Sequence, residues 1–95
     1  MVRIVVTNCG QSEYQIVIEE GTSRTIHRAI VTPEHVKRYA PGGVSAEKLV
    51  KASFEFLLEH ESKESILPQF ELPVIEKYFP DYPRKILAKL SRVES

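Results

Sequence analysis

The residues of this chain that could carry nucleophilic or metal chemistry are one cysteine, Cys9, and three histidines, His27, His35 and His60. A nucleophilic cysteine needs a base positioned beside it, and no local pattern around Cys9 offers one. The spacing of the histidines matches no compact zinc motif, and there is no second cysteine to complete such a site. We therefore interpret the thiol as incidental and the histidines as surface or half-buried, and we predict no catalytic residue and no metal site. A small enzyme that uses Cys9 is the alternative.

Two further patterns have a chemical and a plain interpretation. The acidic series Glu55, Glu59, Glu61 and Glu64 has the ligand type that holds a cation, but it also suits the solvated face and end of a helix. The Gly42–Gly43 pair lacks the lysine and the preceding buried strand that define a phosphate-binding loop. We favour the plain interpretation of both and predict no cofactor.

Basic side chains form two groups that are candidates for contacts with nucleic acid or a partner. Arg24 and Arg28 fall on one face of a predicted strand, and Lys85, Lys89 and Arg92 fall along one stripe of a predicted helix. Residues 84 to 92 contain no acidic side chain. Cations are also favoured near the C-terminus of a helix, so the second group has a structural explanation as well. The acidic end of the helix predicted over 46–60 is its candidate intramolecular partner.

Composition sets limits on the whole chain. Its 95 residues suit one domain, and 42% hydrophobic with 27% charged residues is ordinary for a globular protein. Thirteen basic residues balance thirteen acidic ones, so no net field indicates nucleic acid or an anionic membrane. Apolar runs are too short to span a membrane. The single cysteine fits a reducing compartment, and we predict a cytoplasmic protein.

The first third of the chain predicts strands. Residues 2–8, 13–20 and 24–31 alternate between apolar and polar side chains, with short turn sequences between them. Three consecutive strands with short turns form an antiparallel meander that buries one face. We therefore expect the rest of the chain to cover that face.

The remainder predicts helices. Thr32 and Ser45 are suited to cap helices over about 33–40 and 46–60, and Pro33 suits the first helical position. Apolar residues recur at helical spacing in the second of these helices. Together with the strands, they predict an α+β domain.

The stretch "LPQFELPVIEKYFPDYP", residues 67–83, has two interpretations. Its prolines are too widely spaced for a polyproline ligand, and the residues between them are too apolar to lie in water. We predict helices over about 73–79 and 83–92 whose edges the prolines mark. A docked binding tail is the alternative.

The segment "TIHRAIVTPEHVKRYAPGGVSAEKLVKASFEFLLEHE", residues 25–61, resembles the ribbon-helix-helix family of DNA-binding regulators and antitoxins in its order of strand, short helix, turn and longer helix. In that family two strands of a dimer enter the major groove and alternate side chains read the bases. The resemblance implies Arg24 and Arg28, or Thr25 and His27, as readers. A β-hairpin precedes the strand, which is a departure from the pattern. The chain as a whole is also similar to small prokaryotic proteins, a likeness that implies no activity.

These observations predict a non-enzymatic protein-interaction or regulatory module. A dimeric DNA-binding regulator is the alternative, and a homodimer is compatible with both. The identity of a protein partner is not encoded in any motif that we recognise.

Overall fold

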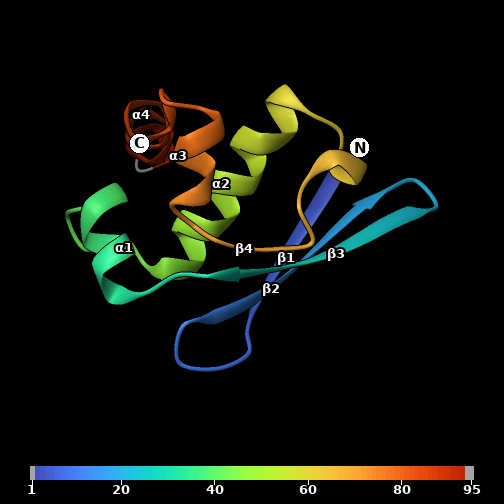
Figure 1. Cartoon of the computed structure of the whole chain (residues 1–95), viewed down its shortest axis with the longest axis horizontal. Helices are drawn as coiled ribbons and strands as arrows, with labels where there is room; N and C mark the ends of the chain where they lie inside the picture. Colours follow the sequence, from blue (N-terminus) through green and yellow to red (C-terminus); the bar gives the residue numbers. More distant parts are fainter. Residues whose placement is uncertain (1, 94–95) are drawn as a thin grey trace.

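Three strands joined by short turns form most of a β-sheet. The computed structural model describes residues 2–93, except for the side chains of residues 92 and 93. Strands β1 (Val2–Asn8), β2 (Glu13–Glu20) and β3 (Ser23–Ile30) run antiparallel, with Ile4 opposite Ile18 and Ile16 opposite His27. Gly21 begins the tight turn between β2 and β3. Its φ of 62° is a left-handed backbone conformation, which glycine adopts without steric cost. The predicted antiparallel meander is confirmed (Figure 1).

The alternating pattern of the strands separates a buried face from an open face. Tyr14, Ile16 and Ile18 of β2 are buried, whereas Val17 on the other face is only partly covered. In register with Val17 lie Val5 of β1 and Ile26 of β3, which are 37% and 53% exposed. Helices therefore cover only one side of the sheet.

The sheet has a fourth strand, so our prediction of three strands is wrong in this respect. Strand β4 (Gln69–Glu71) pairs with β3 in parallel, and the strand order is β1-β2-β3-β4. With three residues, β4 is too short to show an alternating pattern. Its place depends on the connection through the helices, which brings residues 69–71 back beside β3.

The four α-helices of the described residues agree with the prediction to within one or two residues at each end, and a short 3₁₀ helix that was not predicted lies between the second and the third. The helical part comprises α1 (Pro33–Tyr39), α2 (Ala46–His60), the short 3₁₀ helix η1 (Lys63–Ser65), α3 (Val74–Tyr78) and α4 (Tyr82–Val93). The predicted caps are present, since the hydroxyl of Thr32 accepts a hydrogen bond from the His35 amide and that of Ser45 accepts one from the Lys48 amide. The Thr32 amide in turn donates to Nδ1 of His35 at 3.1 Å.

Helix α2 lies against the sheet, and the segment after it completes the core (Figure 1). The Phe54 side chain is fully buried, between His27 at a ring distance of 5.7 Å and Phe70 at 5.8 Å. Within the proline-containing stretch, Phe70, Leu72 and Ile75 are buried. This stretch is therefore ordinary folded structure, as predicted.

Two hydroxyl hydrogen bonds and one pair of packed rings connect the four α-helices. The Ser53 hydroxyl lies 2.6 Å from that of Tyr82 and donates to the Leu49 carbonyl, and the two rings of Tyr39 and Tyr82 lie 5.0 Å apart. The Tyr39 hydroxyl donates to the Glu76 carboxylate at 2.8 Å. Burial and then this bond raise the pKa of Tyr39 to about 12, and burial raises the pKa of Tyr82 still further.

Because the pKa values of Tyr39 and Tyr82 are raised in the folded chain, we expect the free energy of unfolding to fall at alkaline pH. Below pH 10.0, the ordinary phenol pKa, Tyr39 is protonated in both the folded and the unfolded chain. Between that value and about 12, the unfolded chain loses this proton first, so the free energy of unfolding falls as the pH rises. Denaturant titrations at about pH 9 and about pH 11 should show a smaller loss in Tyr39→Phe than in wild type. Tyr78→Phe, which removes a surface phenol, is the control, and an equal loss in all three proteins would contradict this prediction.

Candidate functional site

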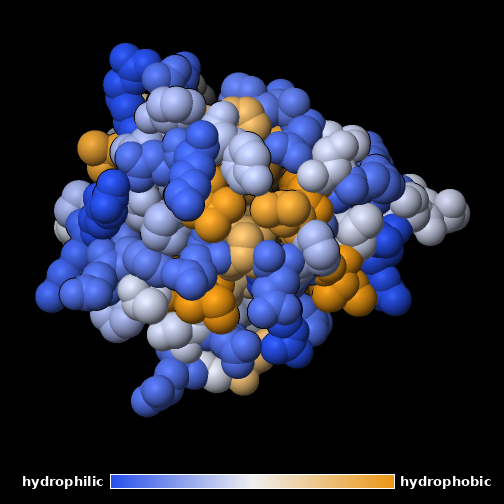
Figure 2. Space-filling model, in the orientation of Figure 1, coloured by the Kyte–Doolittle hydropathy of each residue, from blue (hydrophilic) through white to orange (hydrophobic). Residues whose placement is uncertain are grey.

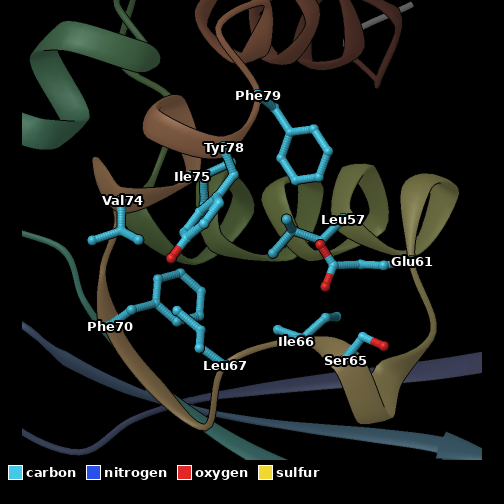
Figure 3. A pocket seen from close by; sticks show the side chains of 10 residues that line it. All are labelled: Leu57, Glu61, Ser65, Ile66, Leu67, Phe70, Val74, Ile75, Tyr78 and Phe79. Carbon is cyan, nitrogen blue, oxygen red and sulfur yellow. The ribbon is translucent and has the colours of Figure 1, made fainter.

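An apolar pocket lies where α2, η1, β4 and α3 meet. It encloses about 190 Å³, and its walls are mostly large apolar side chains (Figure 3). The lining residues are Leu57, Glu61, Ser65, Ile66, Leu67, Phe70, Val74, Ile75, Tyr78 and Phe79. At its rim, Leu67 is 43% exposed and Tyr78 is 67% exposed. Apolar side chains also gather at the centre of this face of the molecule (Figure 2). Such a hollow, with a few polar groups, is the usual form of a binding site.

Two polar groups lie at opposite ends of the pocket. The Glu61 carboxylate turns toward Leu57 at one end, and the Tyr78 ring extends over the other end near Phe70 (Figure 3). Among the described residues, the Glu61 carboxylate forms no hydrogen bond or ion pair. Glu61 also follows the last residue of α2, where the helix dipole is negative. This end of the pocket therefore favours a cationic group.

A second, more open hollow adjoins the pocket along β4. It measures about 540 Å³ and shares Phe70 and Val74 with the pocket. Its other lining residues are Ile30, Gln69, Glu71, Pro73 and Lys77. With the shared residue Phe70, the lining of the hollow includes all three residues of β4, so the hollow follows the strand. We call the pocket and this hollow together the β4–α3 groove.

The local sequence explains why the groove has this shape. Pro73 cannot continue the strand pairing that ends at Glu71, and it occupies the N-cap of α3 instead. Pro80 follows α3 and limits it to a little more than one turn. The chain thus reverses sharply after β4 and leaves a helix of five residues beside the strand. Pro73 also lines the open hollow of the groove.

His27 and Lys63 hold the segment that leads into β4. The Nδ1 atom of His27 lies 2.9 Å from the Leu67 carbonyl, and Nε2 lies 2.9 Å from the Thr25 hydroxyl. His27 is 3% exposed, so the expectation of a surface or half-buried histidine is wrong here. The ammonium of Lys63 lies 2.8 Å from Glu64 and 3.2 Å from Glu20, and the bond to Glu64 holds the pKa of this lysine above its ordinary value.

The other candidates for chemistry are placed apart. Cys9 is exposed in the turn after β1, His35 belongs to the cap of α1, and His60 stacks on Phe79 at 5.0 Å. In the acidic series, Glu59 pairs with Lys89 and Glu64 with Lys63. Among residues 2–93, no three histidine, cysteine or acidic side chains gather in a way that could hold a metal ion. Of the described residues singled out for chemistry in the sequence, only Glu61 of the acidic series lines the groove.

The predicted basic contacts form two groups that the structure does not bring together with the groove. Arg24 and Arg28 lie exposed on the open face of the sheet, where Arg28 is 3.6 Å from Glu13. On α4, Lys85 is exposed, whereas Lys89 pairs with Glu59 of α2 at 2.7 Å, as the sequence led us to expect. The side chain of Arg92 lies outside the described part of the chain.

The strand that the ribbon-helix-helix resemblance assigns to DNA is β3. In the sheet it has β2 on one side and β4 on the other. Strand β2 pairs along the whole of β3, whereas β4 pairs only with Arg28–Ile30. The second edge of β3 is therefore paired within the chain only over its last three residues. The hairpin at the start of the sequence indicated one of these pairings, and the other could not be anticipated without β4.

Sequence reasoning recognised the apolar residues of the groove as folded but not as a binding surface. The signal available was the presence of large side chains next to prolines, as at Leu67 before Pro68 and at Val74 and Tyr78 between Pro73 and Pro80. Within residues 2–93, no helix has the length and apolar character needed to cross a membrane. Comparison of the chain with models of protein families, with curated proteins and with solved structures gives no match in any of the three.

Proposed function

We propose that this protein is a non-enzymatic interaction module that binds a segment of a partner protein in the β4–α3 groove. The observation that carries the proposal is the apolar pocket, whose exposed rim residues Leu67 and Tyr78 lie over buried walls. Exposed apolar surface around a preformed hollow is typical of an interaction site.

The size of the pocket favours a side chain over a whole small molecule. Small-molecule sites usually measure roughly 300–1,000 Å³. The pocket is smaller, at about 190 Å³, and the adjoining hollow of about 540 Å³ is an open surface along β4. A dry cavity of about 150 Å³ holds a benzene ring. One large apolar side chain, aromatic or aliphatic, therefore suits the pocket, and the adjoining hollow has room for the residues beside it.

The charge of the site indicates the character of that segment. Glu61 offers a carboxylate at one end of the pocket, and the negative end of α2 acts in the same direction. A lysine or arginine next to the apolar anchor would pair with Glu61. We therefore propose that the ligand segment carries one large apolar residue with a basic residue near it.

Selection from a random peptide library displayed on phage tests this proposal. Peptides enriched by the wild-type protein are expected to share a large apolar residue accompanied by lysine or arginine. Leu67→Glu places a charge at the rim of the pocket and is expected to weaken their binding by at least about tenfold, because desolvating that charge opposes entry of the apolar anchor.

Ile26→Glu is the matched control, since Ile26 is 53% exposed and lies on the open face of the sheet, outside the lining of the groove. It should leave binding unchanged. If no peptide is enriched, or if Ile26→Glu abolishes binding and Leu67→Glu does not, the proposal is wrong.

The alternative of a dimeric DNA-binding regulator has less support. One edge of β3 is paired with β2 along its length and the other is paired with β4 at Arg28–Ile30. Arg28 and Lys89 each have an acidic partner within the chain. Cytoplasmic location and homodimer formation stay predictions from the sequence.

A further inference from the structure

All three residues of β4 line the open hollow of the β4–α3 groove, and among the described residues one edge of this strand has no strand beside it in the sheet. On its other side, β4 is bonded to β3: the Arg28 amide donates to the Pro68 carbonyl at 2.8 Å, and the Leu72 amide donates to the Ile30 carbonyl at 3.0 Å. In a parallel pair, alternate residues direct their backbone groups to the same side. The N–H and C=O groups of Gln69 and Glu71 therefore point away from β3.

These outward groups have the arrangement that another strand needs. Among the described residues, no main-chain hydrogen bond joins Gln69 or Glu71 to another element on that side. Two residues with this orientation offer two donors and two acceptors to an added strand. An unpaired edge of this kind is a template for strand pairing unless it is covered.

The side chain of Phe70 connects this edge with the pocket. Phe70 lines both hollows and is buried against Phe54 of α2, whereas Gln69 and Glu71 are exposed. Side chains of adjacent paired strands share faces of a sheet. A strand added beside β4 would therefore direct alternate side chains to the side on which Phe70 and the pocket lie.

The opposite edge of the sheet, on β1, lacks this combination. Strand β1 is longer, and its outer edge is also free. However, neither of the hollows described above is lined by a residue of β1. Main-chain pairing there would have no adjoining pocket to select a side chain. The β4 edge offers both affinity from backbone groups and specificity from a pocket, which is how proteins that bind peptides by strand addition work.

We propose that the partner segment binds as an extended strand paired with β4, as a fifth strand of the sheet, with its apolar residue in the pocket. This inference rests on the proposed function and adds the conformation of the ligand. The partner is an extended polypeptide with a basic residue that complements Glu61, not a helix.

Hydrogen exchange of the full chain, with and without the tightest-binding peptide from the display selection, provides the first test. The amides of Gln69 and Glu71 are expected to exchange rapidly in the free protein and at least about tenfold more slowly in the complex. The Leu72 amide is the internal control, because it is already bonded to Ile30. Protection of Ile4 and Val6 instead would place the added strand on β1 and overturn the inference.

N-methylation of the same peptide, one backbone nitrogen at a time, provides the second test. A methyl group removes a donor and blocks pairing without changing any side chain. Loss of affinity is expected to be about tenfold at every second residue, with little change between them. If no position shows this alternation while Leu67→Glu still abolishes binding, strand addition is wrong and the proposed function stands. If no peptide binds at all, both fail.

Discussion

A chain that ends at Ser65 is expected to lose its cooperative unfolding transition. This truncation removes β4, α3 and α4, and with the described residues after Ser65 it removes seven buried apolar side chains: Ile66, Phe70, Leu72, Ile75, Tyr82, Ile86 and Leu90. Burial of each such side chain contributes roughly 1.5–3 kcal/mol, and a whole domain is stable by only about 5–15 kcal/mol. The remaining strands and helices would also expose the apolar faces that these residues cover.

Thermal unfolding followed by circular dichroism and by calorimetry measures this effect. The full chain should show one cooperative transition, and the truncated chain should show none or should aggregate. A truncated chain that is monomeric and as stable as the full chain would show that residues 66–93 are a docked tail and not part of the core.

Replacement of Phe54 by alanine is expected to lower the free energy of unfolding by about 3–5 kcal/mol. Phe54 is fully buried between the sheet, through His27, and the returning segment, through Phe70. Its removal leaves a cavity at the place where α2, β3 and β4 meet. The β4–α3 groove should therefore lose its shape together with the stability of the chain.

Chemical denaturation of the purified variants measures this change. Lys51→Ala is the matched control, because Lys51 is exposed on the same helix, and surface replacements usually change stability by less than about 0.5 kcal/mol. A Phe54→Ala variant within 1 kcal/mol or so of the wild type would contradict the position of Phe54 in the core.

The parts of the fold that follow from local pattern could be predicted from the sequence. Alternation of apolar and polar residues located β1, β2 and β3, and the burial of Tyr14, Ile16 and Ile18 shows the expected buried face in β2. The capping residues Thr32 and Ser45 located the starts of α1 and α2 to the residue. Strand alternation and helix capping both depend on residues that are close together in the sequence, so the sequence pattern is enough to predict these elements.

The parts that depend on contacts between distant residues could not be predicted. Strand β4 forms because residues 69–71 pair with β3, some forty positions earlier in the chain. Three residues are too few to show an alternating pattern in the sequence. His27 is buried because Leu67 and Thr25 satisfy both ring nitrogens, which only the folded chain reveals. The groove is a product of this return, so it was missed together with β4.

The candidate basic residues show a different limitation. Helical spacing placed Lys85 and Lys89 on one stripe of α4, and the pairing of Lys89 with Glu59 follows from that placement. Charge alone did not distinguish residues that contact a partner from those that stabilise the fold. Glu61, whose neighbours in sequence pair with lysines, is distinguished only by the pocket beside it.

Resonance mapping of peptide binding on the isotope-labelled full chain tests the central claim most directly. When a library-selected peptide is added, the amide shifts of Leu67, Phe70 and Tyr78 are expected to change most, together with those at the end of α2. Amides on the open face of the sheet, at Val5, Val17 and Ile26, should change little. The largest changes at that face, or at Arg24, would contradict the assignment of the β4–α3 groove as the binding site.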